Sequence, residues 1–438
     1  MSISRYEKYK DSGIDWLGEV PEHWGIRAIK HIVSTPITDG PHETPEFIDE
    51  GVPFVSAEAV STGEIDFDKI RGFISEEDNA RYSQKYIPRL HDIYMVKSGA
   101  TTGVTAIVEV AARFNIWSPL AVIRCSAKFH PYFILNFMRS KNFQEAITLN
   151  WNFGTQQNIG MGVIENLSVP YPPLKEQSAI AVFLDQETAK IEALIVEQQR
   201  LIALLTEKRQ AVISHAVIKG LNSAVPMKDS GVEWLGEVPK HWDVGAIKRF
   251  ASFLDHRRIP LSSEERSYRC GSFPYYGASG IIDSVDEYIF DEDLVLVSED
   301  GANLINRVTP IAFVARERYW VNNHAHILRP ADSNLIYWAE RIEAINLIPF
   351  ITGSAQPKLT IEALANLVIA VPPSERERSD IERFVVQQSV QLADLVDEAQ
   401  KGITLLQERR SALISAAVTG KINVYGLVAA QPKSEAAT

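Results

Sequence analysis

Two long segments of the chain place residues on a seven-residue repeat. In the first segment, one heptad position holds Ile191, Gln198, Leu205 and Val212, and a second position three residues later holds Leu194 and Leu201. The second segment repeats the arrangement with Leu392, Ala399, Leu406 and Leu413, and with Leu395. A narrow seam of two positions in seven is typical of a coiled coil, whereas a surface helix has a broader apolar stripe.

Each segment is about 42 residues long, which corresponds to about 63 Å of helix. A helix of this kind cannot bury its seam alone, and the other segment is its natural partner. Since the region between the two segments must turn the chain back, we predict that the two helices pack antiparallel. The alternative is that each helix packs on its own globular region.

The regions outside the helices carry short apolar runs between turn residues. Runs rich in Val, Ile, Phe and Tyr and bounded by Gly or Pro are typical of strands. Such runs occupy residues 51–56, 91–99, 105–110, 120–125, 287–290, 293–301, 311–315 and 324–329. Residues 131–147 and 334–347 have helical spacing instead. Each region is therefore predicted to be a mixed α+β domain.

The chain repeats itself. Residues 11–30 read DSGIDWLGEVPEHWGIRAIK, and fourteen of the twenty positions are identical in residues 229–248. A proline pair at 172–173 recurs at 372–373, so the offset between the copies falls from 218 to 200 residues. The framework is kept while the interior differs, which indicates two copies of one scaffold with different surfaces. Ser374 and Glu377 are spaced as a capping box at the start of the second helix.

These patterns predict an α+β fold in which two globular domains are separated by two long antiparallel coiled-coil helices, with a pseudo-twofold internal repeat. The boundaries are expected at 1–165 (first domain), 166–219 (helix), 220–365 (second domain), 366–422 (helix) and 423–438 (flexible tail). Residues 1–24 should pack near the end of the second helix, since their equivalent follows the first helix. That contact would close a pseudo-twofold ring.

Composition and charge narrow the class of protein. The 438 residues are 45% hydrophobic and 23% charged, with two cysteines and no apolar run near the ~18 residues of a membrane span. The N-terminus lacks the apolar stretch of a signal peptide, and two cysteines cannot build a disulfide framework or a four-ligand zinc site by themselves. We expect a cytoplasmic protein with reduced cysteines and no membrane contact.

Motifs for catalysis are missing from the sequence. It has neither a phosphate-binding GxxxxGK[ST] loop nor a GxGxxG after a strand. His23 and His241 each precede a Trp of the repeated block, and a structural role is expected for both. His324 and His326 alternate on a predicted strand without a visible third ligand, so no metal site is predicted. The chain is therefore expected to be non-catalytic.

Polar loops flanked by aromatic and basic residues are the remaining candidates for function. Asn and Gln can pair with adenine and Arg with guanine in the major groove, while Ser, Thr and Lys can hold phosphates. The candidate DNA-binding residues are Ser98, Thr101, Thr102, Asn152, Gln156, Gln157, Arg257, Arg258, Tyr276, Asn303, Arg307, Asn322, Asn323 and Gln356. Gln157 and Gln356 recur in both copies, which fits a shared backbone or phosphate role better than base reading.

The charge balance bears on how DNA would be bound. The chain has 44 Lys and Arg against 56 Asp and Glu, a formal charge of −12. Residues 25–160 hold 13 basic and 15 acidic side chains, and residues 243–358 hold 12 and 16. Neither domain is basic, so its own phosphate contacts should be modest. We expect weak DNA binding by the isolated chain and a positive channel completed by partners.

At this point the motifs carry a family resemblance. The chain resembles the specificity subunit of a type I restriction–modification system from about residue 11 to 420. The resemblance lies in the duplicated DSGxxWLGEVPxHW block, HDIYMVKSGATTG, FPYYGASGIID, DEDLVLVSEDGAN, the GTQQ and GSAQ elements, and the PPLKEQ and PPSERE helix starts. Each motif alone is modest, but their order, occurring twice, is highly specific.

The resemblance implies two target-recognition domains, each reading one half of a split, asymmetric site on double-stranded DNA, with the helices as a spacer. It implies two modification subunits that bind S-adenosylmethionine and methylate adenine, and restriction subunits that use ATP and Mg to translocate and cleave. No cofactor is expected in this chain. The alternatives are a pseudo-symmetric interaction scaffold or acidic DNA mimic that does not bind DNA, and an enzyme with a site split between the domains. Acids and bases are interspersed along both domains, which argues against the mimic.

Overall fold

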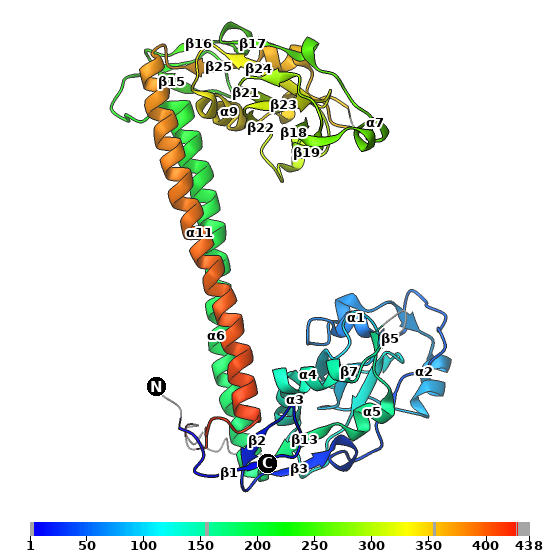
Figure 1. The fold of residues 1–438 in the computed structure, drawn as a ribbon. Helices are drawn as coiled ribbons and strands as arrows, with labels where there is room; N and C mark the ends of the chain where they lie inside the picture. Colours follow the sequence, from blue (N-terminus) through cyan, green and yellow to red (C-terminus); the bar gives the residue numbers. More distant parts are fainter. Residues whose placement is uncertain (1–3, 154–156, 354–355, 426, 428–438) are drawn as a thin grey trace. The chain divides into compact units, whose positions relative to one another are not determined.

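The computed structural model describes residues 4–153, 157–353, 356–425 and 427. The chain divides into two compact units: unit 1 contains residues 1–198 and 401–438, and unit 2 contains residues 199–400. Two long helices, α6 (Leu174–Lys219) and α11 (Glu375–Val418), each contribute one part to each unit (Figure 1). Among the described helices, none is both long and apolar enough to cross a membrane.

The parts of the two helices in each unit lie side by side and antiparallel. In unit 1, a Cβ on Gly402 would lie 3.8 Å from Oε1 of Gln198, and Arg410 lies 3.9 Å from Glu192. In unit 2, the guanidinium of Arg209 lies 3.4 Å from the hydroxyl of Ser389. Residue numbers fall along one helix as they rise along the other, so the predicted antiparallel coiled coil is confirmed.

The first seam position is as predicted, and the second is not. Ile191 and its heptad equivalents are buried or partly buried, as are Leu392 and its equivalents. In contrast, Leu194 and Leu395 are each 51% exposed, while Ile195 is 5% exposed. The second seam position therefore lies four residues after the first, not three. The sequence is ambiguous here because apolar residues occupy both flanks, and only the partner helix decides between them.

In unit 1, a β hairpin is followed by three small sheets and a second hairpin. The first hairpin pairs β1 (Tyr9–Asp11) with β2 (Glu19–Pro21), and β3 (Gly25–Ala28) pairs with β13 (Ser168–Tyr171). An antiparallel four-stranded sheet has the order β4 (Thr38–Asp39), β10 (Leu120–Ile123), β7 (Ile93–Val96), β8 (Thr105–Ile107). A three-stranded sheet has the order β6 (Phe73–Ile74), β5 (Val52–Val55), β9 (Asn115–Ile116), and β11 (Asn152–Phe153) pairs with β12 (Gln157–Asn158).

The helices of unit 1 cover these sheets and join the coiled coil in one core. They are α1 (Ala57–Val60), α2 (Glu76–Ser83), α3 (Pro131–Arg139), α4 (Lys141–Leu149) and α5 (Met161–Asn166), with short 3-10 turns at Ile29–His31 and Phe67–Lys69. The apolar stripe of α3 packs with the first turns of α6 and the last turns of α11. The coiled coil is therefore built into the core of the domain.

Unit 2 repeats this plan with a different outer sheet. Strands β14 (Met227–Asp229) and β15 (Glu237–Pro239) form the hairpin, and β16 (Asp243–Ala246) pairs with β25 (Val368–Val371). Both units contain an antiparallel four-stranded sheet of the same strand arrangement, which we call the shared sheet. In unit 2 its order is β17 (Ala251–Phe253), β24 (Ala325–Pro330), β21 (Leu294–Ser298), β22 (Ala312–Ala315). The second sheet, which we call the outer sheet, has three strands in unit 1 and four in unit 2. In unit 2 its order is β19 (Gly280–Val285), β18 (Cys270–Gly277), β23 (Arg318–Val321), β20 (Phe290–Asp291).

The helices of unit 2 are α7 (Ser263–Tyr268), α8 (Asn303–Asn306), α9 (Leu335–Glu343) and α10 (Ile361–Asn366), with 3-10 turns at Ile247–Arg249, Asp255–Arg257 and Ile348–Phe350. Helix α9 corresponds to α3 of unit 1, as the helical spacing of its sequence predicts. The long β18–β19 hairpin takes the place of the β5–β6 pair of unit 1, since β18 and β5 each also pair in parallel with a later strand, β23 and β9 respectively. We expected Tyr276 on a polar loop, but it lies within β18, where Gly and Ser in the surrounding sequence hide the strand pattern.

The repeated His-Trp pair ties each framework block to the start of a long helix. In unit 1, Nε1 of Trp24 donates to Glu176 at 3.0 Å, and His23 lies 2.9 Å from the same carboxylate. In unit 2, Nε1 of Trp242 donates to Glu377 at 2.9 Å, and His241 also contacts Glu377. The structural role predicted for both histidines is thus seen. The capping box expected at Ser374 is not seen, because the carboxylate of Glu377 is bonded to His241 and Trp242 instead.

Residues near the two ends of the chain meet in unit 1. The amide of Asn423 donates to the carbonyl of Ser4 at 2.8 Å, and the hydroxyl of Tyr9 donates to the carbonyl of Gly420 at 3.0 Å. Gly420 has a positive φ of 72°, and a Cβ there would lie 2.3 Å from Pro21. The N-terminal hairpin therefore packs against the end of α11, as the repeat predicts.

Candidate nucleic-acid interface

Three segments of unit 1 meet at one end of its four-stranded sheet. The amide of Gly99 donates to the carbonyl of Gln157 at 3.0 Å, and the amide of Ile159 donates to the carbonyl of Lys97 at 2.9 Å. We call the described residues of these segments the loop cluster of unit 1: residues 39–42, 97–104, 152–153 and 157–158. Of the polar residues that the sequence singled out in the first domain, Ser98, Thr101, Thr102 and Gln157 are thereby brought together.

The predicted residues of unit 1 differ in how they face solvent. Ser98 and Thr101 are partly exposed, and Gln157 is exposed. Thr102 is buried, and its hydroxyl donates to the carbonyl of Gly99 at 2.7 Å, which closes the turn. The backbone of Asn152 lies in β11 of the hairpin, and Gln156 lies outside the described residues.

Unit 2 has an equivalent loop cluster with the same backbone hydrogen bonds. The amide of Gly301 donates to the carbonyl of Pro357 at 3.0 Å, and the amide of Leu359 donates to the carbonyl of Glu299 at 2.7 Å. The loop cluster of unit 2 consists of the described residues 255–260, 299–311, 322–324, 352–353 and 356–359. By this register Gln157 corresponds to Pro357, so the shared glutamine position inferred from the sequence is wrong by one residue.

A buried aspartate lies at the base of the loop cluster of unit 1. Asp39 accepts a hydrogen bond from Lys85 at 2.5 Å, and Lys97 and His42 each lie 3.1 Å from its carboxylate. Burial alone raises the pKa of Asp39, but the hydrogen bonds from Lys85 and Lys97 outweigh this and lower it. The carboxylate is therefore ionised and holds three side chains from three segments.

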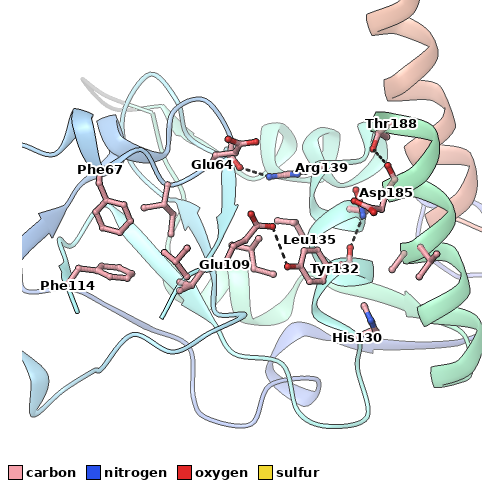
Figure 2. A pocket seen from close by; sticks show the side chains of 18 residues that line it. Glu64, Phe67, Glu109, Phe114, His130, Tyr132, Leu135, Arg139, Asp185 and Thr188 are labelled. Carbon is pink, nitrogen blue, oxygen red and sulfur yellow. Dashed lines mark hydrogen bonds between the residues drawn. The ribbon is translucent and has the colours of Figure 1, made fainter. Parts of the chain in front are cut away.

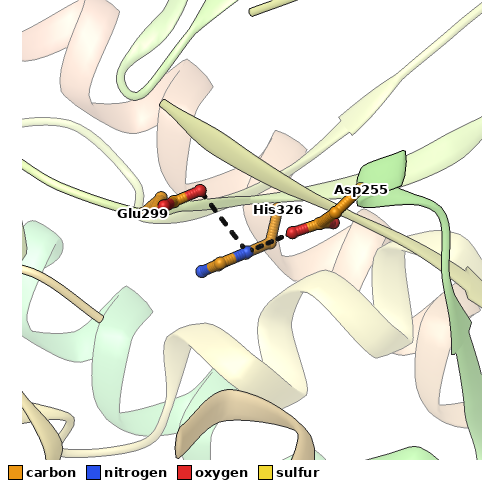
Figure 3. Close-up of side chains that lie close together, drawn as sticks. All are labelled: Asp255, Glu299 and His326. Carbon is orange, nitrogen blue, oxygen red and sulfur yellow. Dashed lines mark hydrogen bonds and ion pairs between the residues drawn. The ribbon is translucent and has the colours of Figure 1, made fainter. Parts of the chain in front are cut away.

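The corresponding aspartate of unit 2 belongs to a larger charge network, which we call the His326 cluster: Asp255, Arg258, Glu299, His326 and Lys358. Nδ1 of His326 lies 2.6 Å from Asp255 and 3.7 Å from Glu299 (Figure 3). Arg258 contacts both carboxylates, and Lys358 lies 3.0 Å from Glu299. Burial alone raises the pKa of Glu299, but Arg258 and Lys358 lower it.

The geometry of Asp255, Glu299 and His326 superficially resembles a metal site, since their ligand atoms lie within 4.8 Å of one another. However, a guanidinium and an ammonium already neutralise the two carboxylates. A divalent cation would have to displace or repel both groups, and His326 Nδ1 is bonded to Asp255. The arrangement favours a closed ion-pair network over a metal site.

All three predicted arginines and one predicted asparagine of unit 2 are held by the protein itself. Arg257 donates to Glu292 at 2.9 Å and stacks on the ring of Phe290. Arg258 belongs to the His326 cluster, and Arg307 donates to the carbonyls of residues 343 and 345. The side chain of Asn303 bonds both backbone groups of residue 309. In this structure these four side chains brace the loop cluster.

The other predicted residues of unit 2 divide between buried and exposed positions. Tyr276 is partly buried between Phe313 and Tyr319, outside the loop cluster. Asn322 is buried, and its side-chain oxygen accepts from the amide of residue 324 at 2.7 Å. Asn323 and Gln356 are exposed. These two side chains are therefore accessible to a ligand at the surface of the loop cluster.

Sequence reasoning missed the two aspartates, one in each unit, that hold these charge networks. Asp39 and Asp255 follow the repeated block at almost the same distance, and His42 and Arg258 follow each of them by three residues. This repeated Asp-x-x-cation spacing was the available signal. It was weak because the rest of each network comes from residues that are distant in sequence.

A cavity of about 570 Å³ lies elsewhere in unit 1, between α3, α6 and the loop at Gly63. Figure 2 shows its mixed lining, in which the hydroxyl of Tyr132 donates to Glu109 at 3.3 Å. Arg139 donates to the carbonyls of Gly63 and Thr105, and burial lowers the pKa of its guanidinium. The cavity contains none of the residues of the loop cluster and is separate from the candidate interface.

Comparison with known proteins agrees with the repeated architecture. A family model for the type I restriction modification DNA specificity domain matches residues 21–202 and again residues 239–395. Each match covers one recognition domain and part of the helical region. The two matches together span more than half of the chain.

Individual relatives give the same picture. A protein of Haemophilus influenzae named as specificity subunit S.HindORF215P is 32% identical over 128 residues, which is 29% of this chain and 32% of that protein. A Methanocaldococcus jannaschii protein named as the MjaX specificity subunit is 23% identical over 97% of this chain and 99% of its own length. A solved structure concerning complex assembly and conformational transition of the type I R-M system aligns with a TM-score of 0.61, 17% identity, and coverage of 91% of this chain and 98% of that one. The chain belongs to the type I restriction–modification DNA specificity family.

Proposed function

We propose that this chain is the DNA-recognition subunit of a type I restriction–modification complex, and that each loop cluster reads one half of a bipartite, asymmetric DNA site. The observation that carries the proposal is the duplicated loop cluster. Its backbone hydrogen bonds are the same in both units, while its exposed side chains differ. Two unlike surfaces on one scaffold are what an asymmetric split site requires.

The exposed side chains fit recognition of base edges and phosphates. Unit 1 offers the hydroxyls of Ser98 and Thr101, which are partly exposed, and the exposed amide of Gln157. Unit 2 offers the exposed amides of Asn323 and Gln356. Amides pair with adenine in the major groove, and hydroxyls bond either bases or phosphates. The inner residues of each loop cluster serve as its support, since their side chains are bonded to the protein.

In this proposal the chain is non-catalytic and takes its chemistry from partners. Two modification subunits supply S-adenosylmethionine and adenine methylation, and restriction subunits supply ATP-driven translocation and cleavage. Neither recognition domain is basic overall, so the partners complete the positive surface for the DNA backbone. Binding of the isolated chain to DNA at physiological salt should therefore be weak.

The helix pair offers a docking surface for such partners. In unit 1, Leu194 and Leu405 lie at neighbouring levels of the helix pair, and both are exposed. In unit 2, Leu204 and Leu395 do the same. Exposed apolar residues gathered on a helix surface mark an interaction site. One such patch in each unit fits two copies of a modification subunit that binds by helix packing.

A selection experiment tests the proposal. The complex of the full chain with its modification subunits is incubated with duplexes of random sequence, and the bound fraction is sequenced. Enrichment of one motif with two unlike halves and a fixed gap is expected. A stable complex that enriches no motif, or one that enriches a single uninterrupted motif, would contradict it.

A further inference from the structure

The loop between β21 and β22 of unit 2 carries two exposed apolar side chains. Val308 is 84% exposed and Ile305, on the short helix α8, is 50% exposed. The neighbouring Leu304 is fully buried in the core of unit 2. Leu304 therefore anchors the loop, while Ile305 and Val308, which we call the apolar tip, face solvent.

Hydrogen bonds hold this loop in one conformation. The side chain of Asn303 donates to the carbonyl of Thr309 and accepts from its amide, both at 3.0 Å. Arg307 has a positive φ of 47° at the end of α8, and its guanidinium donates to the carbonyl of Glu343 at 2.7 Å. The carboxylate of Glu343 accepts from the amide of Ile311 at 2.8 Å. The apolar tip cannot turn inward without breaking these bonds.

The apolar tip gains nothing from the fold of this chain. Burial of a Val or Ile side chain is favourable, yet the braced loop keeps both side chains in water. Both are branched at Cβ, so their χ1 angles are restricted. A rigid apolar projection of this kind loses little conformational freedom when it enters a partner. The loop is therefore suited to insertion into another molecule.

Unit 1 has a shorter and more polar loop at this place. Both loops join matching strands of the shared sheet, β21 to β22 and β7 to β8. Between the same backbone hydrogen bonds, unit 2 has residues 302–310 where unit 1 has only residues 100–103. The segment of unit 1 reads ATTG and contains no large apolar residue. The apolar tip is therefore a feature of unit 2 and not of the common scaffold.

The charges around the apolar tip favour an anionic partner. The carboxylates in the loop cluster of unit 2 are those of Asp255, Glu299 and Asp300, and each side chain is at most 14% exposed. In contrast, the side chains of Arg307 and Lys358 are 30% and 51% exposed. Shielded carboxylates beside exposed cations give a locally positive surface. Such a surface fits the phosphates of DNA on either side of an inserted apolar group.

We propose that Ile305 and Val308 form a wedge that enters between two neighbouring base pairs of the half-site read by unit 2 and unstacks them. Apolar side chains that enter a base step kink the duplex and allow closer contact with the protein. The proposal rests on the proposed function, because it assigns a half-site to unit 2. It means that this half-site is read partly through the deformability of one base step, whereas the other half-site is not.

The test uses the complex of the full chain with its modification subunits and the site obtained by the selection experiment. 2-Aminopurine, whose fluorescence rises on unstacking, replaces adenines one at a time across both halves and the gap. The wild-type complex should raise the fluorescence at one step, in one half only. The double variant Ile305→Thr with Val308→Thr should lose this rise. A rise from an adenine extruded for methylation should remain in the variant, so the two signals are distinguishable.

Affinity gives a second readout. The double variant should bind the selected site about tenfold more weakly, the loss expected when the apolar contact of two side chains is removed. It should bind an unrelated duplex as the wild type does. A mismatch at the wedged step weakens stacking beforehand and should shrink the difference between variant and wild type.

Two single variants serve as controls. Val308→Ile keeps the tip apolar and should match the wild type in both readouts. Val110→Thr should match it too, because Val110 is a 54% exposed valine of unit 1 outside the loop cluster.

Two results would overturn the proposal. One is a wild-type complex that binds the selected site but shows no unstacking that depends on the apolar tip, in which case the proposed function stands and the wedge fails alone. The other is a double variant that loses its modification subunits, seen as a lower mass of the complex in light scattering, which would make the apolar tip a protein contact. If the wild-type complex enriches no motif, the proposed function fails and the wedge fails with it.

Discussion

Arg341 shows that one buried side chain can work against stability. It is fully buried on α9, its Nε donates to the carbonyl of Ala370 at 3.2 Å, and Nη1 and Nη2 have no partner among the described residues. Burial lowers the pKa of its guanidinium. In unit 1 the equivalent position on α3 holds Phe137, which is buried in an apolar core. The scaffold therefore accepts an apolar side chain here.

Replacement of Arg341 by Met should stabilise unit 2. Exchanging a buried, incompletely bonded charge for an apolar side chain of similar length is expected to raise the free energy of unfolding by about 1–4 kcal/mol. Urea denaturation of the full chain measures this. Arg383→Met, at an exposed site, is the control and should change stability by less than about 0.5 kcal/mol. A loss of stability in Arg341→Met would show that the guanidinium is fully satisfied.

The lowered pKa of Asp39 predicts sensitivity to acid. Since its pKa is lower in the folded than in the unfolded chain, its contribution is complete above the ordinary carboxylate range and is lost as the pH falls through the folded value. Asp39→Asn should reduce the melting temperature at neutral pH, because Lys97 is left without its carboxylate. The difference from wild type should shrink on acidification. A constant difference at all pH values would contradict this account.

At the residue scale, the sequence indicated the kind of surface but not which side chains form it. Polar residues of the right type do gather in each loop cluster. However, Arg307 is occupied by Glu343 and by the carbonyl of Ile345, and Arg257 by Glu292. These partners are more than thirty residues away in sequence. Local patterns do not reveal such contacts, so the sequence could not separate supporting residues from exposed ones.

At the element scale, the register of the coiled coil gives a matched pair of substitutions. Ile195→Ala removes a side chain that is 5% exposed and should lower the free energy of unfolding by about 2–4 kcal/mol. Leu194→Gln changes an exposed neighbour and should cost less than about 0.5 kcal/mol. Chemical denaturation of both variants decides the register. If Leu194→Gln cost more stability than Ile195→Ala, the second seam position would lie three residues after the first, as the sequence predicts.

The elements themselves were largely predictable. Heptads located both long helices, and apolar runs located three of the four strands of the shared sheet in each unit, since burial on a fixed side imposes a period. The edge strands β4 and β17 were missed. The β18–β19 hairpin was missed because its Gly, Ser and Pro residues resemble a loop, while its pairing with β23 comes from tertiary contact. The second seam position was also missed, because which flank of each helix becomes buried depends on the partner helix.

At the scale of the whole molecule, the internal repeat decided the architecture. The duplicated block implied two equivalent domains, and the structure divides into two units with the same framework anchor and the same loop-cluster hydrogen bonds. The repeat also predicted that the N-terminal hairpin packs against the end of α11. The repeat does not predict which DNA sequence is read, because base reading depends on loop geometry and DNA shape.

The most direct test of two half-site readers on a spacer is methylation mapping. The wild-type chain is co-expressed with its modification subunit in a host without DNA methylation, beside a variant with one extra heptad in both α6 and α11. A heptad keeps the seam in phase and adds about 10 Å of helix, or about three base pairs. We predict methyladenine in one split motif for the wild type, and the same two halves with a longer gap for the variant. Methylation in a single uninterrupted motif, or an unchanged gap in an active variant, would contradict the account.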